Sequence, residues 1–192
     1  MIKPLVKPTD DGAPGVYAFK DRVPVVDRES FVHPSAVLIG DVTVGRHCYI
    51  GPGASLRGDF GTIIVGDGVN IQDNCVLHCF PDRRVEIEAN GHIGHGAVLH
   101  GCVVRHDVLV GIQAVIMDGG DVGAESIVGA MSFLPANTTF PPRSMIRGTP
   151  AAVIRALSDA EVAAKKRATE TYQQLAADSL TSMTETTAER PD

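Results

Sequence analysis

Aliphatic residues recur every six positions through the middle of this 192-residue chain. The positions in register are Leu38, Val44, Ile50 and Leu56; Val65, Ile71 and Leu77; Ile87, Ile93 and Leu99; and Val104, Val110, Ile116, Val122 and Val128. A period of six fits neither a helix face nor the two-residue alternation of a strand. The spacing predicts an all-β fold, a parallel β-helix in which each hexapeptide forms one side of a three-sided coil. In the alternative, a β-sandwich, all these spacings would have to arise by chance.

The repeat divides the chain into five segments. We expect an N-terminal extension with a capping strand over residues 1–30, a β-helix over 31–134, an extended connector over 135–157, an α-helix over 158–178 and a flexible tail over 179–192. Ser158 followed by Glu161 forms a capping-box sequence, which marks the start of the helix. The expected apolar side of this helix consists of Val162, Ala168, Tyr172 and Leu175.

Two insertions interrupt the repeat, one between Leu56 and Val65 and one between Leu77 and Ile87. We expect both to form loops at corners of the coil, where binding residues often lie. The second insertion carries Arg83 and Arg84, which are candidate ligands for the phosphate groups of coenzyme A as a cofactor or cosubstrate. The alternative for such an arginine pair is an ordinary solvated loop.

Composition and charge disfavour several classes of partner. The formal net charge of −6 argues against a general role in binding nucleic acid or anionic membranes. No apolar run approaches the length of a membrane span, and the first residues lack the apolar core of a signal peptide. The four cysteines have no CxxC pairing, which is typical of reduced thiols. We therefore expect a cytoplasmic protein without nucleic-acid or membrane partners.

The repeat also predicts which polar residues meet. Because three hexapeptides complete one coil, Leu56, Leu77 and Leu99 stack on one side in successive coils. The residues that follow them are Arg57, His78 and His100. Neighbouring strands lie about 4.8 Å apart. Two imidazoles at that separation can both reach one metal ion at roughly 2.0–2.1 Å.

His95 falls on a different side of the coil, in a column with Asp73. One chain cannot easily bring His95 to His78 and His100, whereas a neighbouring subunit can if side meets side around a threefold axis. Each of the three equivalent sites would then have two histidines from one chain and one from the next. Three neutral imidazoles with an open position form a catalytic zinc arrangement. We therefore expect a homotrimer with metal centres between its subunits.

Three motifs carry a resemblance to a known family: RGDFG (57–61), NIQDNCVLH (70–78) and GHIGHGAVLHG (91–101). They resemble the γ-class carbonic anhydrases and their hexapeptide-repeat relatives, and within these the subgroup of phenylacetic acid degradation proteins PaaY and carnitine operon proteins CaiE. The likeness covers roughly residues 20–178. It implies a left-handed β-helix with a C-terminal helix, assembled as a homotrimer. It further implies that the metal ligands are His78, His95 and His100, with Zn2+ as the usual ion and Fe2+ or Co2+ as alternatives.

The same resemblance implies roles for four further residues, which we take as candidate catalytic residues. Arg57 and Asp59 match a pair that forms a salt bridge between subunits. Gln72 matches a residue that orients the metal-bound water, and Asp73 matches a nearby structural carboxylate. The remaining histidines, expected to be ordinary surface residues, are His33, His47, His92 and His106.

The chain departs from the well-studied carbonic anhydrases at two places that concern proton transfer. Phe60 stands where they carry a glutamate, and the short segment CFPDRRVE replaces an acidic loop with a proton-shuttling glutamate. Fast CO2 hydration must export a proton in each turnover. We therefore predict a metal-bound hydroxide enzyme with weak carbonic anhydrase activity, acting as a lyase on CO2 or bicarbonate, or with thioesterase activity on acyl-CoA beside a CoA-dependent pathway such as phenylacetate catabolism.

Two other functions stay open. Many hexapeptide proteins are metal-free acyltransferases that use acyl-CoA with a histidine base, and the segment RGTPAAVIR resembles their C-terminal extension. A structural trimer that binds metal with little catalysis is the third class.

Overall fold

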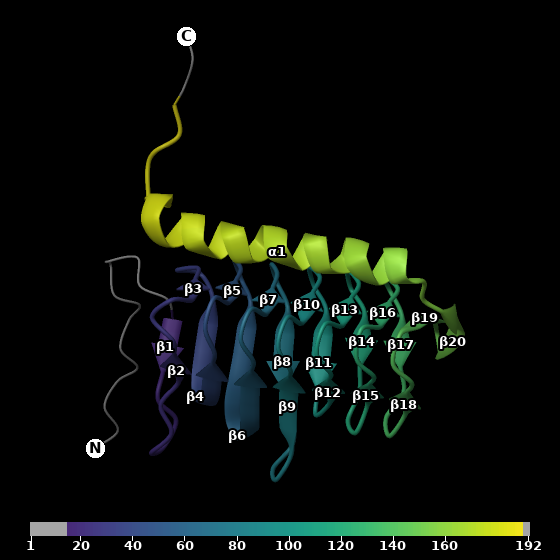
Figure 1. Ribbon diagram of the computed structural model, residues 1–192. Coiled ribbons are helices and arrows are strands. Elements are labelled where there is room, and N and C mark those ends of the chain that lie inside the picture. The colour runs from purple at the N-terminus through teal and green to yellow at the C-terminus, as the bar shows by residue number, and fades with distance from the viewer. Residues whose placement is uncertain (1–14, 190–192) are drawn as a thin grey trace.

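The computed structural model describes residues 15–189, which form a parallel β-helix with one long helix lying along it (Figure 1). One sheet has 12 strands: β1 (Gly15–Tyr17), β2 (Val25–Val26), β4 (Val37–Val44), β6 (Ser55–Val65), β8 (Val76–His78), β9 (Arg84–Ile87), β11 (Val98–His100), β12 (Val103–Val104), β14 (Val115–Ile116), β15 (Asp121–Val122), β17 (Phe133–Leu134) and β18 (Thr139–Phe140). The other has 8: β3 (Phe31–Val32), β5 (Tyr49–Ile50), β7 (Asn70–Ile71), β10 (His92–Ile93), β13 (Leu109–Val110), β16 (Ile127–Val128), β19 (Ser144–Gly148) and β20 (Ala151–Ala156). The helix is α1 (Asp159–Ser182).

These strands make the three sides of the coil. The first side runs from β4 through β6, β8, β11 and β14 to β17, and the second from β4 through β6, β9, β12 and β15 to β18. They belong to one sheet because β4 and β6 are long enough to continue around the corner between them. The third side is the 8-stranded sheet, and all its pairings are parallel except that of β19 with β20.

The six-residue period was correctly interpreted as the core of the coil. All fifteen predicted inward positions are buried, and none is more than 2% exposed. The same spacing continues beyond Val128 through Leu134, Phe140 and Ile146, which are also buried. A narrow core filled by stacked aliphatic side chains explains why the chain needs so few aromatic residues.

The coil therefore extends beyond the predicted segment 31–134. Most of the predicted connector, 135–157, belongs to it, since β18 and β19 pair with β15 and β16. The consecutive prolines at 141 and 142 lie between those strands, at a corner where proline is tolerated. At the other end, β1 and β2 pair in parallel with β4, so residues 15–30 begin the first coil. Residues 1–14 and 190–192 lie outside the described part.

The two insertions have different structures. The first was expected to form a loop, but residues 55–65 are one continuous strand, β6, which bends around the corner. The second insertion does form a loop, over residues 79–83, and in Figure 1 this loop projects below β9 on the edge of the coil opposite α1.

Helix α1 begins with the predicted capping box of Ser158 and Glu161 but continues to Ser182, four residues beyond the expected end at 178. Its predicted apolar side is right for Val162, which is buried, and for Tyr172, which packs against Phe31 and Tyr49, but wrong for Ala168 and Leu175, which are exposed. The buried residues of the helix are Val162, Lys165, Thr169, Ala176 and Ser179.

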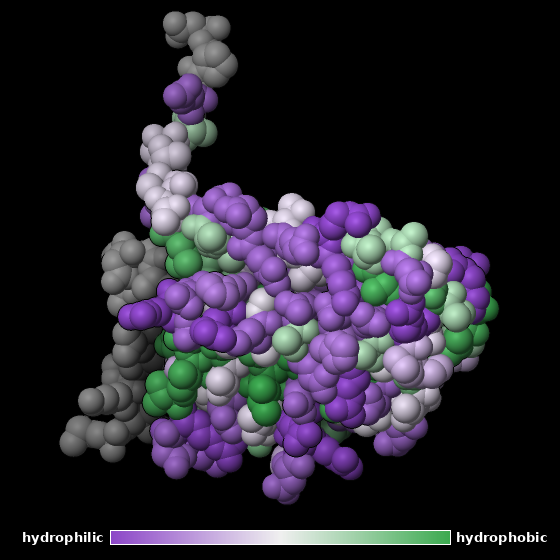
Figure 2. Space-filling view, in the orientation of Figure 1, coloured by the Kyte–Doolittle hydropathy of each residue, from purple (hydrophilic) through white to green (hydrophobic). Residues whose placement is uncertain are grey.

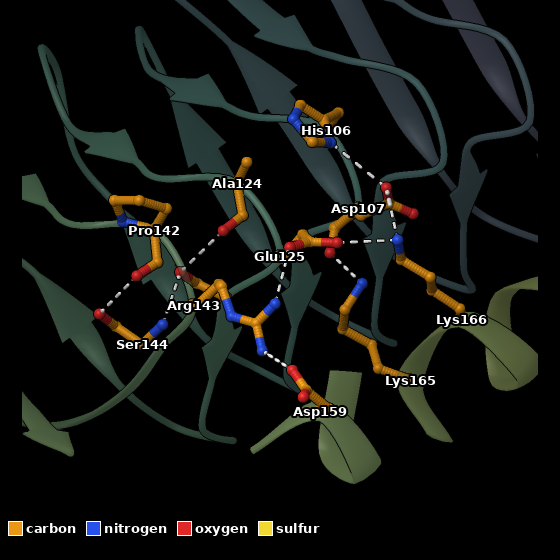
Figure 3. Close-up of polar contacts among 11 residues, drawn as sticks. His106, Asp107, Ala124, Glu125, Pro142, Arg143, Ser144, Asp159, Lys165 and Lys166 are labelled. Carbon is orange, nitrogen blue, oxygen red and sulfur yellow. Dashed lines mark hydrogen bonds and ion pairs between the residues drawn. The ribbon is translucent and has the colours of Figure 1, made fainter. Parts of the chain in front are cut away.

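Polar contacts hold the first half of α1 on the coil (Figure 3). The buried Lys165 donates to the backbone oxygen of Asp107, and Lys166 lies 2.8 Å from a carboxylate oxygen of Glu125. Arg143 forms an ion pair with Asp159 at the start of the helix. Side chains that satisfy one another in this way can be buried without an apolar stripe. This is why hydrophobic periodicity identified only part of the buried side of α1.

Polar residues cover much of the face seen in Figure 2, with hydrophobic residues gathered in separate patches. No helix among residues 15–189 is long and apolar enough to cross a membrane.

The stacked core generates a stability prediction. We expect Leu99→Ala to lower the free energy of unfolding by about 2–5 kcal/mol, because Leu99 is fully buried and its removal leaves a cavity. Leu175→Ala makes the same chemical change at a residue 39% exposed and should cost less than about 1 kcal/mol. Urea unfolding followed by circular dichroism measures both. Equal losses in the two variants would contradict the assignment of the core.

Candidate active site

The predicted column of Arg57, His78 and His100 is present on the first side. Arg57 in β6 pairs in register with His78 in β8, which pairs with His100 in β11. The centroids of the two imidazole rings lie 5.2 Å apart. The inward leucine that precedes each residue fixes its direction, because successive side chains of a strand point to opposite faces.

Two carboxylates hold the outer ends of the histidine pair. Asp59 accepts from Arg57 Nη1 at 2.8 Å and lies 3.1 Å from His78 Nε2. At the other end, His100 Nδ1 lies 2.8 Å from Asp118 Oδ2. The five side chains therefore form one continuous polar chain across neighbouring coils.

This arrangement leaves the inner nitrogens of the pair facing each other. A carboxylate only accepts hydrogen bonds, so His78 Nε2 and His100 Nδ1 each carry a proton. In the neutral form of each ring the other nitrogen, His78 Nδ1 or His100 Nε2, carries a lone pair, and these two nitrogens lie 3.2 Å apart. Two lone pairs at this distance repel each other unless a proton or a cation lies between them.

Burial changes the acid–base properties of this cluster. Burial lowers the pKa of His78. The hydrogen bond and charge of Asp59 raise this pKa, and the charges of Arg57 and His100 lower it further. Burial alone would raise the pKa of Asp59, but hydrogen bonds from Arg57 and His78 hold that pKa below its ordinary value. Asp59 is therefore ionised at neutral pH and His78 is neutral. That is the state in which His78 can use its inner lone pair.

Asp118 is a site residue that the sequence analysis missed. Its Oδ1 is buried and has no hydrogen-bond partner among the described residues, although its Oδ2 holds His100. Gly101 makes room for it, because a Cβ at Gly101 would lie 2.4 Å from Asp118 Oδ1 and the glycine has φ +57°. The next coil after His100 is one residue shorter, and extending the column count by that coil would have indicated position 117 or 118.

His95 lies on the third side, two residues after Ile93, as predicted. Its Nδ1 is 2.8 Å from Asp73 Oδ2, and both side chains are over 40% exposed. The contact with Asp73 leaves Nε2 as the free lone pair at the surface. Within residues 15–189 of one chain, no three metal-ligating side chains converge on a single point.

Gln72 and His92 form a buried network beneath α1. Gln72 Nε2 lies 2.8 Å from His92 Nε2 and donates to Asn70 at 3.0 Å, while Thr169 of α1 lies 3.5 Å from His92 Nδ1. His92 was expected to be a surface histidine, and this was wrong because α1 covers it. Burial, reinforced by the Lys165 and His95 charges, lowers the pKa of His92 to about 4. Gln72 shares with His95 a pocket of about 550 Å³.

Arg83 and Arg84 lie at the second insertion, beside the histidine pair. They line a pocket of about 630 Å³ that also includes Phe60. The Phe60 ring centroid is 5.4 Å from that of His78, and the Phe80 centroid is 4.9 Å from that of His100. The second insertion thus places Phe80 against His100, while β6 places Phe60 against His78 and in the same pocket as the two arginines.

Sequence comparisons agree with this architecture. The model of the bacterial transferase hexapeptide family (six repeats) matches residues 24–58. The carnitine operon protein CaiE of Salmonella agona is 52% identical over 170 residues, covering 88% of this chain and 86% of that protein. CaiE of Proteus sp. is 49% identical over 172 residues, covering 90% of this chain and 87% of that protein.

Solved structures include similar folds. A hexapeptide transferase family protein from Anaplasma phagocytophilum has a TM-score of 0.81 and 31% identity, covering 84% of this chain and 96% of that one. A Bacillus cereus protein, described as a proposed acetyltransferase, has a TM-score of 0.86 and 30% identity. The match covers 87% of this chain and 97% of that one. Perosamine N-acetyltransferase from Caulobacter crescentus, solved with CoA and GDP-perosamine, has a TM-score of 0.58 and 26% identity. The match covers 68% of this chain and 57% of that one.

The buried His92 generates a pH prediction. Its pKa of about 4 lies below the value of about 6.5 in an unfolded chain. The unfolded state therefore binds a proton first as pH falls, so stability is lost between pH 6.5 and pH 4. This loss amounts to about 3 kcal/mol. Urea unfolding at several pH values should give a shallower pH dependence for His92→Gln than for the unaltered protein. The same slope in both would show that His92 does not titrate as described.

Proposed function

Because the chain belongs to the hexapeptide-repeat family of the carnitine operon proteins CaiE, we propose that it is an enzyme that acts on the acyl group of coenzyme A thioesters at a metal-dependent histidine centre. The observation that carries the proposal is the pair of inner nitrogens on His78 and His100, 3.2 Å apart and both free of a carboxylate partner. The transferase relatives, one of them solved with CoA, support the substrate class.

The residues fit a divalent transition metal such as Zn2+, with Fe2+ or Co2+ as alternatives. Two nitrogen ligands of one tetrahedral ion, each at roughly 2.0–2.1 Å, are separated by about 3.3–3.4 Å. The separation of 3.2 Å between His78 Nδ1 and His100 Nε2 is close to this. Carboxylates on the far nitrogens, as supplied by Asp59 and Asp118, are the usual partners of metal-binding histidines. A metal held there would lower the pKa of a water molecule to about 7.

His95 of another copy of the chain is the third ligand in this proposal. Its ring is exposed and fixed by Asp73, as a ligand presented to a neighbouring molecule would be. Close to it on the third side, Ile112 is 51% exposed and Met131 is 71% exposed, which suits a surface covered by another subunit. A closed homotrimer unites the first side of one subunit with the third side of the next.

The chain's own residues position and shield the reaction. Arg57 fixes Asp59, which fixes the ring of His78, and Asp118 does the same for His100. Phe60 packs at a tilt against His78, and Phe80 packs edge-on against His100, so an apolar ring lies beside each imidazole. The reaction breaks the C–S bond of the thioester and transfers the acyl group to water, releasing a carboxylic acid and the CoA thiol. Gln72 lies on the same side as His95 and is proposed to orient the attacking water.

A second candidate is acyl transfer without a metal. The contact between His100 and Asp118 is the arrangement of a general base held by a carboxylate. In that case the acyl group passes to an acceptor other than water, and His78 shares a proton with His100. Hydration of CO2 by the metal centre is a third reaction to assay.

Metal content tests the centre directly. We expect about one metal ion per chain in protein purified without chelator, measured by mass spectrometry of the elements. His95→Ala should lose most of it while keeping the circular dichroism spectrum of the folded coil, because His95 is exposed and outside the core. His106→Ala, at an exposed histidine outside the site, should retain the metal. Protein that contains no metal and takes none up on titration would overturn the metal-dependent proposal.

Turnover separates the candidates. Release of the CoA thiol from acetyl-CoA and phenylacetyl-CoA should occur without an added acceptor and should stop on chelation. His100→Ala should lower kcat/KM at least about 100-fold, since it removes one ligand and its carboxylate contact. Thiol release that needs an added amine or hydroxyl acceptor and survives chelation would favour the transferase. No release with any acyl-CoA, together with measurable CO2 hydration, would favour the carbonic anhydrase reaction.

A further inference from the structure

A second polar pocket lies beside the histidine centre, at the corner between the first and second sides of the coil. We call it the corner groove; it has a volume of about 630 Å³ and is lined in part by Arg22, Phe60, Thr62, Arg83 and Arg84. We propose that the corner groove binds the phosphate groups of the nucleotide end of coenzyme A, with Arg22 as a phosphate ligand together with Arg83 and Arg84. The proposal deepens the thioester function proposed above and rests on it for the identity of the carrier.

Three arginines from two separate segments of the chain meet in this groove. Arg22 comes from the turn before β2, where its backbone is fixed by paired hydrogen bonds with Phe19. Arg83 and Arg84 come from the second insertion, where the backbone oxygen of Arg83 accepts from the amide of Thr62 at 3.2 Å. The backbone is therefore held at both places while the guanidinium groups extend from it. Sequence spacing could not relate residue 22 to residue 83.

The charge of the groove is opposite to that of the chain. Against a net charge of −6 for the whole chain, three arginines and the single carboxylate of Asp82 line it. Arg84 is paired with Glu86 at 2.8 Å. Within residues 15–189, the side chains of Arg22 and Arg83 have no carboxylate within ion-pair distance. Two guanidinium groups are thus left to bind an anion, and guanidinium groups bind phosphate oxygens with two parallel hydrogen bonds.

The register of the coil gives the groove its length. Thr62 in β6 pairs with Arg84 in β9, and β9 pairs with β12, which follows Gly101. Gly119, which precedes β15, lines the groove one coil further. Arg22 precedes β2, which stands one coil before β4. With neighbouring strands about 4.8 Å apart, the five steps from the coil of Arg22 to that of Gly119 give lining residues that span on the order of 24 Å. This is an extended site, suited to a long ligand and larger than one phosphate ion requires.

Phe60 links the groove to the reaction centre. Its ring lines the groove and lies 5.4 Å from the ring of His78. A thioester whose phosphates lie on the arginines can therefore lead its acyl end over Phe60 to the histidine pair. The geometry sets the direction of the substrate, with the nucleotide at the arginines and the C–S bond at the histidines.

Binding of adenosine 3′,5′-bisphosphate, measured by calorimetry, tests the groove without turnover. Arg22→Gln and Arg83→Gln should each weaken binding about tenfold, since each removes charge-assisted hydrogen bonds. Arg167→Gln is the matched control, because it removes an exposed arginine of α1, on the edge of the coil opposite the loop of residues 79–83 (Figure 1). It should bind like the unaltered protein. Melting temperatures of all three variants should be unchanged.

Turnover then distinguishes this proposal from the proposed reaction. Arg22→Gln should raise the KM for acetyl-CoA without changing kcat for this substrate. The thioester S-acetyl-N-acetylcysteamine lacks phosphate, so its kinetics should be the same in the variant and the unaltered protein. Binding of the bisphosphate that depends on Arg22, with no thioester turnover, would overturn the reaction and keep the phosphate site. Turnover with no bisphosphate binding, or with equal binding in Arg22→Gln, would overturn the phosphate site. Equal affinity for inorganic phosphate and the bisphosphate would identify a simple anion site and overturn the nucleotide assignment.

Discussion

The in-register parallel pairing of successive coils is the constraint on which every other feature of this protein depends. Each hydrogen-bonded strand pair fixes a residue of one coil directly beside its counterpart in the next, at a spacing set by backbone geometry. The buried leucines at 56, 77 and 99 hold that register, because a slip of one residue would turn them out of the core. The same register brings Arg57, His78 and His100 into one column. Core and site are therefore products of one pairing pattern.

The chain of polar contacts from Arg57 to Asp118 orients the two histidine rings for binding a cation or a proton. Asp59 and Asp118 each occupy the outer nitrogen of one histidine, so the inner nitrogens are left facing each other. The pair is thus prepared to receive a cation or to share a proton. This preparation comes from hydrogen bonding between coils and needs no mobile loop.

Helix α1 adds a second kind of packing to the coil. Its buried side is mixed: Ala176 and Tyr172 pack with aromatic residues of the coil, whereas Lys165 is buried among the ion pairs and hydrogen bonds seen in Figure 3. By covering part of the third side, the helix buries His92 and holds it neutral beside Gln72, and both residues line the pocket that contains His95. The helix therefore influences the surface that we propose meets another subunit.

The sequence by itself determined the coil, its inward residues, the column of Arg57, His78 and His100, and the separate side that carries His95. It could do so because a six-residue period maps directly onto the sides of a three-sided coil. Tertiary structure decided what lies outside that period. Asp118 follows a shortened coil, and His92 is buried by the docked helix. Arg22 lines the same pocket as Arg83 because the chain before the repeat pairs with the first coil. Each of these contacts joins residues that no fixed spacing relates, so only the folded chain brings them together.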